Sequence, residues 1–270
     1  MDGILVINKP AGMTSHDVVA KLRWILKEKR IGHTGTLDPD ATGVLVVCIG
    51  KATRIIKFLD DSEKIYEGTI TFGIKTDSMD ASGQIIEISD SSELNSNEID
   101  RVFRSFVGEI SQIPPMVSAV KVGGERLYKL ARQGKTIDRE ARKINIFEFK
   151  LTKFYKEYFD DKIFSKADFL VKCSRGTYIR ALASDVGEKL GCGAHLSKLV
   201  RTKSGVFSLK DSIELDDIKK DPNIAYSVLI DIGVALAFMP TIFIGYLLSQ
   251  LEMDIRKLQG RLWESLLKKV

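Results

Sequence analysis

The segment Val44–Ile49 is a continuous apolar run that directly follows a loop rich in glycine and proline. A run of this length between turn residues predicts a strand covered on both faces. Short strands and amphipathic helices are interspersed around it without strict alternation. This pattern favours the α+β class (mixed α/β), with a largely antiparallel central sheet flanked by helices.

Periodicity predicts the other elements. A strand is expected at Gly3–Ile7, followed by a helix that Thr14 or Ser15 caps and that ends near Arg30. Residues 65–74 alternate as a strand, with Gln84–Ile88 as a plausible partner. Further strands are expected at Met116–Val122, Ile144–Tyr155 and Ala167–Cys173, helices at Lys51–Leu59, Asn97–Val107 and Tyr178–Leu190, and a hairpin from Leu196–Val200 and Gly205–Leu209.

The apolar stretch Ile224–Leu251 could suggest a membrane span, but Asp231 and Pro240 interrupt it. A spanning helix needs about 20 uninterrupted apolar residues. The stretch therefore favours a buried helix at Ile232–Phe238 followed by a strand, with no membrane partner. The start MDGILVINKP has no signal-peptide pattern, which predicts a cytoplasmic protein. Three cysteines without a CxxC pair favour a reducing compartment and argue against a zinc site.

Positive charge is concentrated in two segments. The chain carries a net charge of +5, and residues 121–143 alone hold eight basic and three acidic groups, which is the same surplus. Residues 189–210 add five basic groups and no acidic one. Two basic segments on a neutral body predict a polyanion-binding surface, with nucleic acid as the first candidate. The alternative is two solvated faces.

The loop Gly32–Gly43, GHTGTLDPDATG, carries the most informative carboxylate, Asp38. The following proline biases Asp38 toward extended backbone, and the covered strand that comes next can anchor the loop. A carboxylate aimed into a cleft can act as a nucleophile or a base. An Asp before Pro is, however, more often only a turn former.

Tyr66 and Arg180 are the second and third candidates. Tyr66 can stack on a flipped base beside a catalytic carboxylate, or it can be a half-buried strand tyrosine. Arg180, in CSRGTYIR, can pair with a carboxylate and keep it ionised, or it can be a surface arginine. The chain has no phosphate-binding glycine motif, no GxSxG and no zinc-ligand pattern among its three histidines. These residues favour cofactor-free chemistry on a nucleobase or sugar, without a metal.

Five segments in this order closely resemble the TruB family, the tRNA pseudouridine-55 synthases. They are INKPAGMTSHDVV at 7–19, GHTGTLDPDATGVL at 32–45, KIYEGTITFGIKTDSMDASG at 64–83, QIPPMVSAVKVGGERLYKLARQG at 112–134 and CSRGTYIRALASDVGEKLGCGAHLSKLVRT at 173–202. The resemblance covers about residues 3–215. It implies a pseudouridine synthase fold and an isomerase that moves the glycosidic bond of a T-loop uridine in tRNA from N1 to C5, with no cofactor.

The resemblance also implies roles for individual residues. Asp38 matches the catalytic aspartate, Tyr66 the tyrosine that stacks on the flipped base, and Arg180 the arginine paired with the aspartate. Whether the aspartate attacks C1′, attacks the base or removes a ribose proton stays open. The implied substrate-binding residues are Tyr178, Leu199, His33, Lys9 and, in an insertion that closes over RNA, Arg126, Lys129 and Arg132. Lys9 and Pro10 also belong to a motif that packs beside the pocket, where we expect a structural role.

The expected catalytic domain spans residues 1–222, with the insertion at about 112–143. Residues 223–270 are expected to form a truncated or atypical tail instead of the complete RNA-binding domain of the PUA type that many family members carry. The expected partners are the T-stem and T-loop of tRNA, bound by a monomer. Two alternatives remain: a tRNA-binding and refolding module, and a guide-RNA-dependent pseudouridine synthase subunit.

Overall fold

The computed structural model describes residues 1–239, apart from 61, 119–120, 123, 128–129, 131–132, 136 and 160–161. The backbone, but not the side chain, is described at 121, 122, 126 and 159. Two compact units are distinguished, Met1–Ile232 and Gly233–Val270. The first unit contains all of the elements discussed below except the last helix, of which it includes only Ile232.

The strands in chain order are β1 (Gly3–Lys9), β2 (Ile31–Thr34), β3 (Thr42–Ile49), β4 (Lys64–Phe72), β5 (Ile74–Thr76), β6 (Ile85–Ile88), β7 (Gly108–Gln112), β8 (Lys121–Val122), β9 (Glu125–Arg126), β10 (Arg142–Phe159), β11 (Lys162–Cys173), β12 (Ala194–Ser204), β13 (Phe207–Ser208) and β14 (Ile213–Glu214). The helices are α1 (Ser15–Leu26), α2 (Ile56–Asp60), α3 (Ser96–Arg104), α5 (Ile179–Lys189), α6 (Leu215–Lys220), α7 (Ile224–Ser227) and α8 (Ile232–Ala235), with 3₁₀ turns at Gly50–Ile55 and Leu209–Asp211.

Ten of the described strands form one sheet with the order β14-β1-β3-β12-β4-β11-β10-β7, to which β2 adds beside β3 and β13 beside β12. Only the β1–β14 and β3–β12 pairs are parallel. The expected class, an α+β fold with a largely antiparallel sheet, is therefore confirmed. The pairs β5–β6 and β8–β9 form two small separate sheets.

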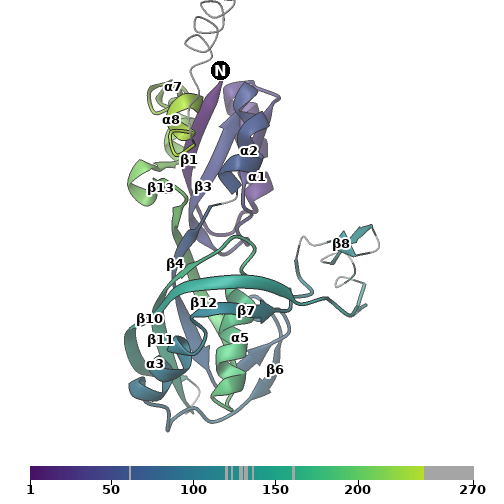
Figure 1. Ribbon diagram of the computed structural model, residues 1–270, viewed down its shortest axis with the longest axis vertical. Coiled ribbons are helices and arrows are strands. Elements are labelled where there is room, and N and C mark those ends of the chain that lie inside the picture. The colour runs from purple at the N-terminus through teal and green to yellow at the C-terminus, as the bar shows by residue number, and fades with distance from the viewer. Residues whose placement is uncertain are drawn as a thin grey trace, which may run out of the picture. The chain divides into compact units, whose positions relative to one another are not determined.

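Two hydrophobic cores cover different parts of the sheet. Helix α1 packs with β1, β3 and α6 through residues such as Leu22, Leu45 and Ile218. Helices α3 and α5 pack with β4, β10 and β11 through residues such as Phe103, Phe169 and Leu182. Figure 1 shows α1 and α2 beside β1 and β3, and α3 and α5 beside β10, β11 and β12. Strands β12 and β4 are at the centre of the order, and their buried residues, such as Ile70 and Leu196, belong to the second of these cores.

Local sequence signals explain the first helix and the covered strand. The Thr14 side chain accepts from the Asp17 N–H while Asp17 accepts from the Thr14 N–H, which is a capping box. Helix α1 then ends at Leu26 because Lys27 adopts a left-handed conformation, with φ of 50°. Gly43 and every residue of Val44–Ile49 are buried, as the apolar run predicts.

Several expectations about elements were wrong. Gly32–Thr34, expected as part of the loop Gly32–Gly43, belongs to β2, which pairs with β3. Strand β6 pairs with β5, whereas β4 pairs with β11 and β12. Within the expected strand, Met116–Ser118 is irregular and Lys121–Val122 is extended, while residues 119–120 lie outside the described part of the chain. Lys51–Leu59 is divided between a 3₁₀ turn and α2.

The tail also differs from its expected structure. Helix α8 ends at Ala235, its one buried residue, and Phe238 is 56% exposed. The strand expected after it lies outside the described residues. Among the helices described, none is long and apolar enough to cross a lipid bilayer. The domain boundary expected near residue 222 stays a prediction.

Candidate active site

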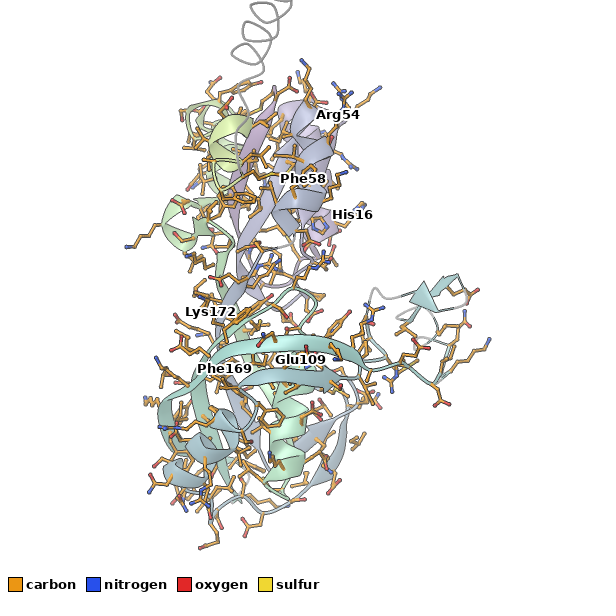
Figure 2. The ribbon with its side chains drawn as sticks, viewed as in Figure 1. His16, Arg54, Phe58, Glu109, Phe169 and Lys172 are labelled. Atoms are coloured by element: carbon orange, nitrogen blue, oxygen red, sulfur yellow. The ribbon has the colours of Figure 1, made fainter. Side chains whose placement is uncertain are left out.

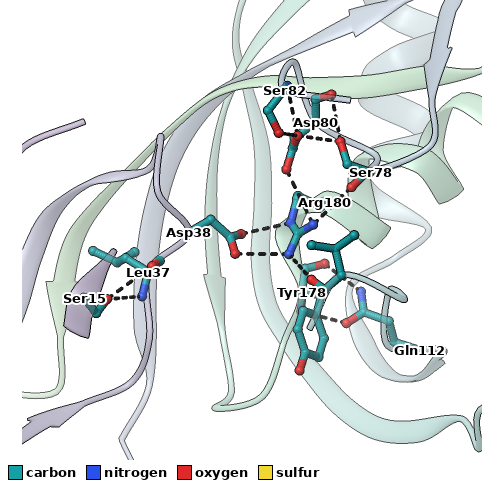
Figure 3. A network of polar contacts seen from close by, with 10 residues as sticks. Ser15, Leu37, Asp38, Ser78, Asp80, Ser82, Gln112, Tyr178 and Arg180 are labelled. Carbon is teal, nitrogen blue, oxygen red and sulfur yellow. Dashed lines mark hydrogen bonds and ion pairs between the residues drawn. The ribbon is translucent and has the colours of Figure 1, made fainter. Parts of the chain in front are cut away.

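The Asp38 loop lies between β2 and β3, and hydrogen bonds fix its backbone at the residue before Asp38 and at the residue after it. Before it, the Leu37 N–H donates to Ser15 Oγ at 2.9 Å, and Ser15 Oγ lies 3.2 Å from the Leu37 carbonyl oxygen (Figure 3). After it, Lys9 Nζ donates to the Pro39 carbonyl at 2.8 Å. Ser15 starts α1 and Lys9 ends β1, so two rigid elements fix the residue between them.

Lys9 acts on the loop and not on the cavity. Its side chain is completely buried, and its ammonium also donates to the carbonyls of Pro10 and Met13 at 2.8 and 2.6 Å. Desolvation lowers the pKa of Lys9 to about 8. Because three backbone oxygens surround the ammonium, its position supports the structural role and not direct substrate contact.

Asp38 and Arg180 form a two-pronged ion pair. Arg180 Nε lies 2.9 Å from Asp38 Oδ2, and Arg180 Nη2 donates to Oδ1 at 3.1 Å (Figure 3). Arg180 is the second residue of α5, and it is 3% exposed. Bidentate pairing of this kind fixes both the distance and the orientation of the carboxylate. The structure thus brings together two of the residues that the sequence singled out.

The environment of Asp38 has opposing effects on its ionisation. The surrounding protein desolvates the carboxylate and raises the pKa of Asp38 above its ordinary value, even though 41% of its side chain remains accessible. The Arg180 guanidinium opposes this shift, while the carboxylate of Asp80 adds to it. Arg180 is therefore the main group that keeps Asp38 charged.

Asp80 is a polar partner that the sequence analysis did not single out. Its Oδ2 lies 3.5 Å from Arg180 Nη1, and its Oδ1 accepts from the hydroxyls of Ser78 and Ser82 at 2.6 Å each. Arg180 also donates to the carbonyls of Ser78 and Val117, at 3.1 and 2.8 Å. Two sequence signals could have indicated it: the turn residues around it, in TDSMDASG, and its place in the family-like segment 64–83.

A cavity of about 510 Å³ opens beside the Asp38–Arg180 pair. Tyr66, Tyr178 and Leu199 line it, from β4, the residue before α5, and β12 respectively. Burial raises the pKa of Tyr66, and the nearby Arg201 guanidinium opposes that effect. The Gln112 side chain fixes the backbone of Tyr178, because its amide donates to the Tyr178 carbonyl at 3.0 Å and its oxygen accepts from the Tyr178 N–H at 2.7 Å. This volume is within the range of small-molecule sites.

Arg201 is a second residue that sequence reasoning missed, since it counted only as one of five cations in 189–210. It is 1% exposed and lies directly opposite Tyr66 in the β12–β4 pair. Its guanidinium donates to the carbonyls of Val44 and Gly35, at 2.8 and 2.9 Å. A side chain at Gly43 would come within 2.3 Å of the Arg201 carbonyl oxygen, so only glycine fits there. Arg201 therefore joins the Asp38 loop to the strand that carries Tyr66.

Replacing Arg201 with Met is expected to destabilise the protein by about 2–4 kcal/mol, because two buried carbonyls lose their donors. The measurement is the free energy of unfolding in urea. Lys198→Met is the matched control, because Lys198 is an exposed cation on the same strand, and it should change stability by less than about 0.5 kcal/mol. Equal stabilities of the two variants would contradict the role assigned to Arg201.

Of the remaining predicted site residues, only His33 is among the described side chains, and it does not line this cavity. His33 lies in β2 opposite Val47 and is not among the lining residues; burial lowers its pKa, and its Nδ1 is buried without a described hydrogen-bond partner. Lys129, Arg132 and the side chain of Arg126 lie outside the described residues. The wall of the cavity carries positive charge from three residues that were not predicted as site residues, namely Arg142, Lys143 and Arg175. No grouping of three or more potential metal ligands occurs in the part of the chain that the structure describes.

Comparisons with known proteins agree on one family. Residues 23–179 match the N-terminal domain model of the TruB family of pseudouridylate synthases, and residues 180–226 match the C-terminal domain model of tRNA pseudouridylate synthase B. The tRNA pseudouridine synthase B of Bacillus cytotoxicus is 48% identical over 247 residues, which cover 90% of this chain and 80% of that protein. The Geobacillus kaustophilus protein of the same name is 47% identical over 243 residues, covering 89% and 85%.

Two solved structures are similar in fold. One is an H/ACA ribonucleoprotein bound to a substrate RNA that contains 2′-deoxyuridine, with 27% identity, a TM-score of 0.60, and coverage of 83% of this chain and 55% of that chain. The other is a Cbf5–Nop10–Gar1 complex, with 30% identity, a TM-score of 0.63, and coverage of 87% and 61%. This chain thus spans little more than half of the length of those structural relatives.

Proposed function

The chain belongs to the TruB family of tRNA pseudouridine synthases, and from this premise we propose that its cavity isomerises a T-loop uridine of tRNA at the Asp38–Arg180 pair. The activity is that of an RNA-modifying isomerase, as the family and the similar proteins show. The single observation that supports the proposed site is the bidentate pair, 2.9 and 3.1 Å long, at the wall of a cavity that also contains Tyr66.

The reaction begins with a uridine rotated out of its stack. Eversion costs a few kcal/mol, and stacking on an aromatic ring returns about 1–3 kcal/mol. Tyr66 and Leu199 provide an aromatic and an aliphatic wall on neighbouring central strands, with Leu199 opposite Gly68, two residues from Tyr66. A side chain at Gly68 would come within 2.4 Å of the Lys198 carbonyl oxygen and 2.8 Å of the Phe169 ring, so only glycine fits at this position opposite Leu199.

The chemistry then moves one bond. The N1–C1′ bond breaks, the detached uracil turns within the cavity, and C1′ joins C5. The C5 proton must leave to restore the C5–C6 double bond, and N1, released from the ribose, takes up a proton, so no proton is gained or lost overall. Attack on C1′, attack on the base and removal of a ribose proton are the three roles open to Asp38, and each requires the ionised carboxylate that Arg180 maintains. Tyr66 lies on the same wall and is the residue that we assign to the C5 proton.

Replacing Tyr66 with Phe is expected to lower the single-turnover rate by about 10²–10⁴-fold, because stacking is retained but the proton acceptor is lost. Binding of tRNA should stay unchanged. The rate is measured on transcribed tRNA, with uridine and with uridine carrying deuterium at C5. A larger isotope effect in the variant supports the assignment, whereas full activity of Tyr66→Phe would contradict it.

The overall function is tested by incubating unmodified, transcribed tRNA with the protein alone and mapping pseudouridine at single-nucleotide resolution. One modified T-loop uridine is the expected result. Modification that appears only after a guide RNA and further proteins are added would instead favour the guide-dependent alternative. The similarity in fold to the H/ACA ribonucleoprotein is the observation that favours this alternative. Absence of pseudouridine under both conditions would overturn the proposal.

A further inference from the structure

Strand β10 carries a bulge that turns one aromatic side chain out of the core. Ile146 pairs with Cys173 and Glu148 pairs with Lys172, so Phe147 between them has no partner on β11. Ile146 is fully buried, whereas Phe147 is 47% exposed. Bulges re-aim side chains in this way and are frequent beside active sites.

Phe147 lines a second cavity, of about 410 Å³. The other lining residues are Ser62, Glu63, Lys143, Ser174 and Arg175. Lys143, Ser174 and Arg175 also line the cavity that contains Asp38 and Tyr66, so the two cavities are adjacent and share a wall. An RNA strand with one base in the first cavity can therefore extend across this shared wall into the second cavity.

One cation lies near the Phe147 ring, and two more line its cavity. Lys172 Nζ, on a residue labelled in Figure 2, lies 6.0 Å from the ring centroid and 3.0 Å from Glu63 Oε1. Lys143 Nζ lies 2.8 Å from Oε1 of Glu109, which Figure 2 also labels. Both ion pairs are solvent-accessible, and such pairs contribute little, so an RNA phosphate can replace a carboxylate at small cost.

We propose that this second cavity binds the nucleotide next to the flipped uridine, with its base stacked on Phe147 and its phosphate beside Lys143 and Arg175. An exposed aromatic ring bordered by cations is how proteins hold single-stranded nucleotides without reading their sequence. The inference rests on the proposed function, since it requires an RNA strand with one base in the first cavity. It adds a separate contact for that strand.

Replacing Phe147 with Ala is expected to weaken binding of a T-arm RNA by about 5- to 100-fold, the contribution of one stacked base. The rate at saturating RNA should stay within about twofold, because Phe147 does not line the cavity of the chemical step. Phe147→Tyr, which retains a ring, should bind RNA nearly as the unaltered protein does. Tyr158→Ala is the matched control, because Tyr158 is a 77% exposed aromatic residue on the same strand, and it should leave binding unchanged.

The decisive measurement combines these variants with RNAs that lack one base, on the 5′ or the 3′ side of the target uridine. At one of the two positions, loss of the base should weaken binding to the unaltered protein but cause no further loss with Phe147→Ala. Independent, additive losses at both positions, or normal binding by Phe147→Ala, would overturn the inference. Pseudouridine formation by the unaltered protein is followed in the same samples, so that failure of this contact is distinguishable from failure of the proposed function.

Discussion

Asp38→Asn is expected to lower pseudouridine formation by at least about 10³-fold, because an amide supplies neither the charge nor the basicity that each of its three open roles requires. Asn has nearly the same shape, so the clamps on Leu37 and Pro39 remain, and one hydrogen bond from Arg180 can persist. Binding of tRNA should therefore stay within a few-fold of normal. Single-turnover assays and equilibrium binding measure the two quantities separately.

The matched control is Asp40→Asn in the same loop. Asp40 is exposed and does not line the main cavity, so this variant should keep nearly full activity. Retained turnover by Asp38→Asn would refute the role of Asp38. If the same inactive variant still accelerates folding of a misfolded tRNA, the protein has a refolding function as well, which does not depend on the chemistry.

Arg180→Met is expected to give the second-largest effect, a loss of about 10²–10⁴-fold near neutral pH. Burial already raises the pKa of Asp38, and Arg180 is the main group that opposes it. Without Arg180 the pKa rises further, so a smaller fraction of Asp38 is ionised at a given pH. Activity that depends on the ionised form is lost as pH falls through this pKa, and the acid limb of the pH–rate profile therefore moves to higher pH.

The measurement is the single-turnover rate between about pH 5 and pH 9. Arg180→Lys should show a smaller shift, because a lysine keeps the charge but not the two-pronged geometry. Arg142→Met removes another cation from the same cavity and should weaken RNA binding without moving the acid limb. An unchanged profile for Arg180→Met would argue against control of Asp38 by this pair.

Elements with local signals were predictable from the sequence. The capping box at Thr14 defines the start of α1, and the unbroken apolar run defines β3. The partners of β4 were not predictable, because β11 and β12 follow it by about a hundred residues or more and strand pairing is a non-local property. The exposed strand β6 was expected to pair with the strand at residues 65–74, but it pairs with the short strand β5.

The site shows the same division. Asp38, Tyr66 and Arg180 stand in recognisable motifs, and their grouping around one cavity agrees with the chemistry inferred from them. Arg201 stands in the quoted segment 173–202 but was not singled out, because a basic residue among other basic residues suggests an exposed surface, whereas the fold buries it almost completely. Asp80 lies 3.5 Å from Arg180 in a fold that pairs its turn with Leu196 of β12, which is a non-local contact. Sequence alone does not distinguish a solvated charge from one enclosed by the fold.

The double clamp on the Asp38 loop links the reacting acid to the first strand and first helix of the chain. Ser15 and Lys9 lie on α1 and β1, which contribute to one core, whereas Arg180 lies on α5, which contributes to the other. A small displacement of one core relative to the other would therefore change the Asp38–Arg180 geometry and lower the enzyme activity before the protein unfolds. In mild denaturant or on mild heating, pseudouridine formation should be lost while circular dichroism still shows the helices and strands to be intact.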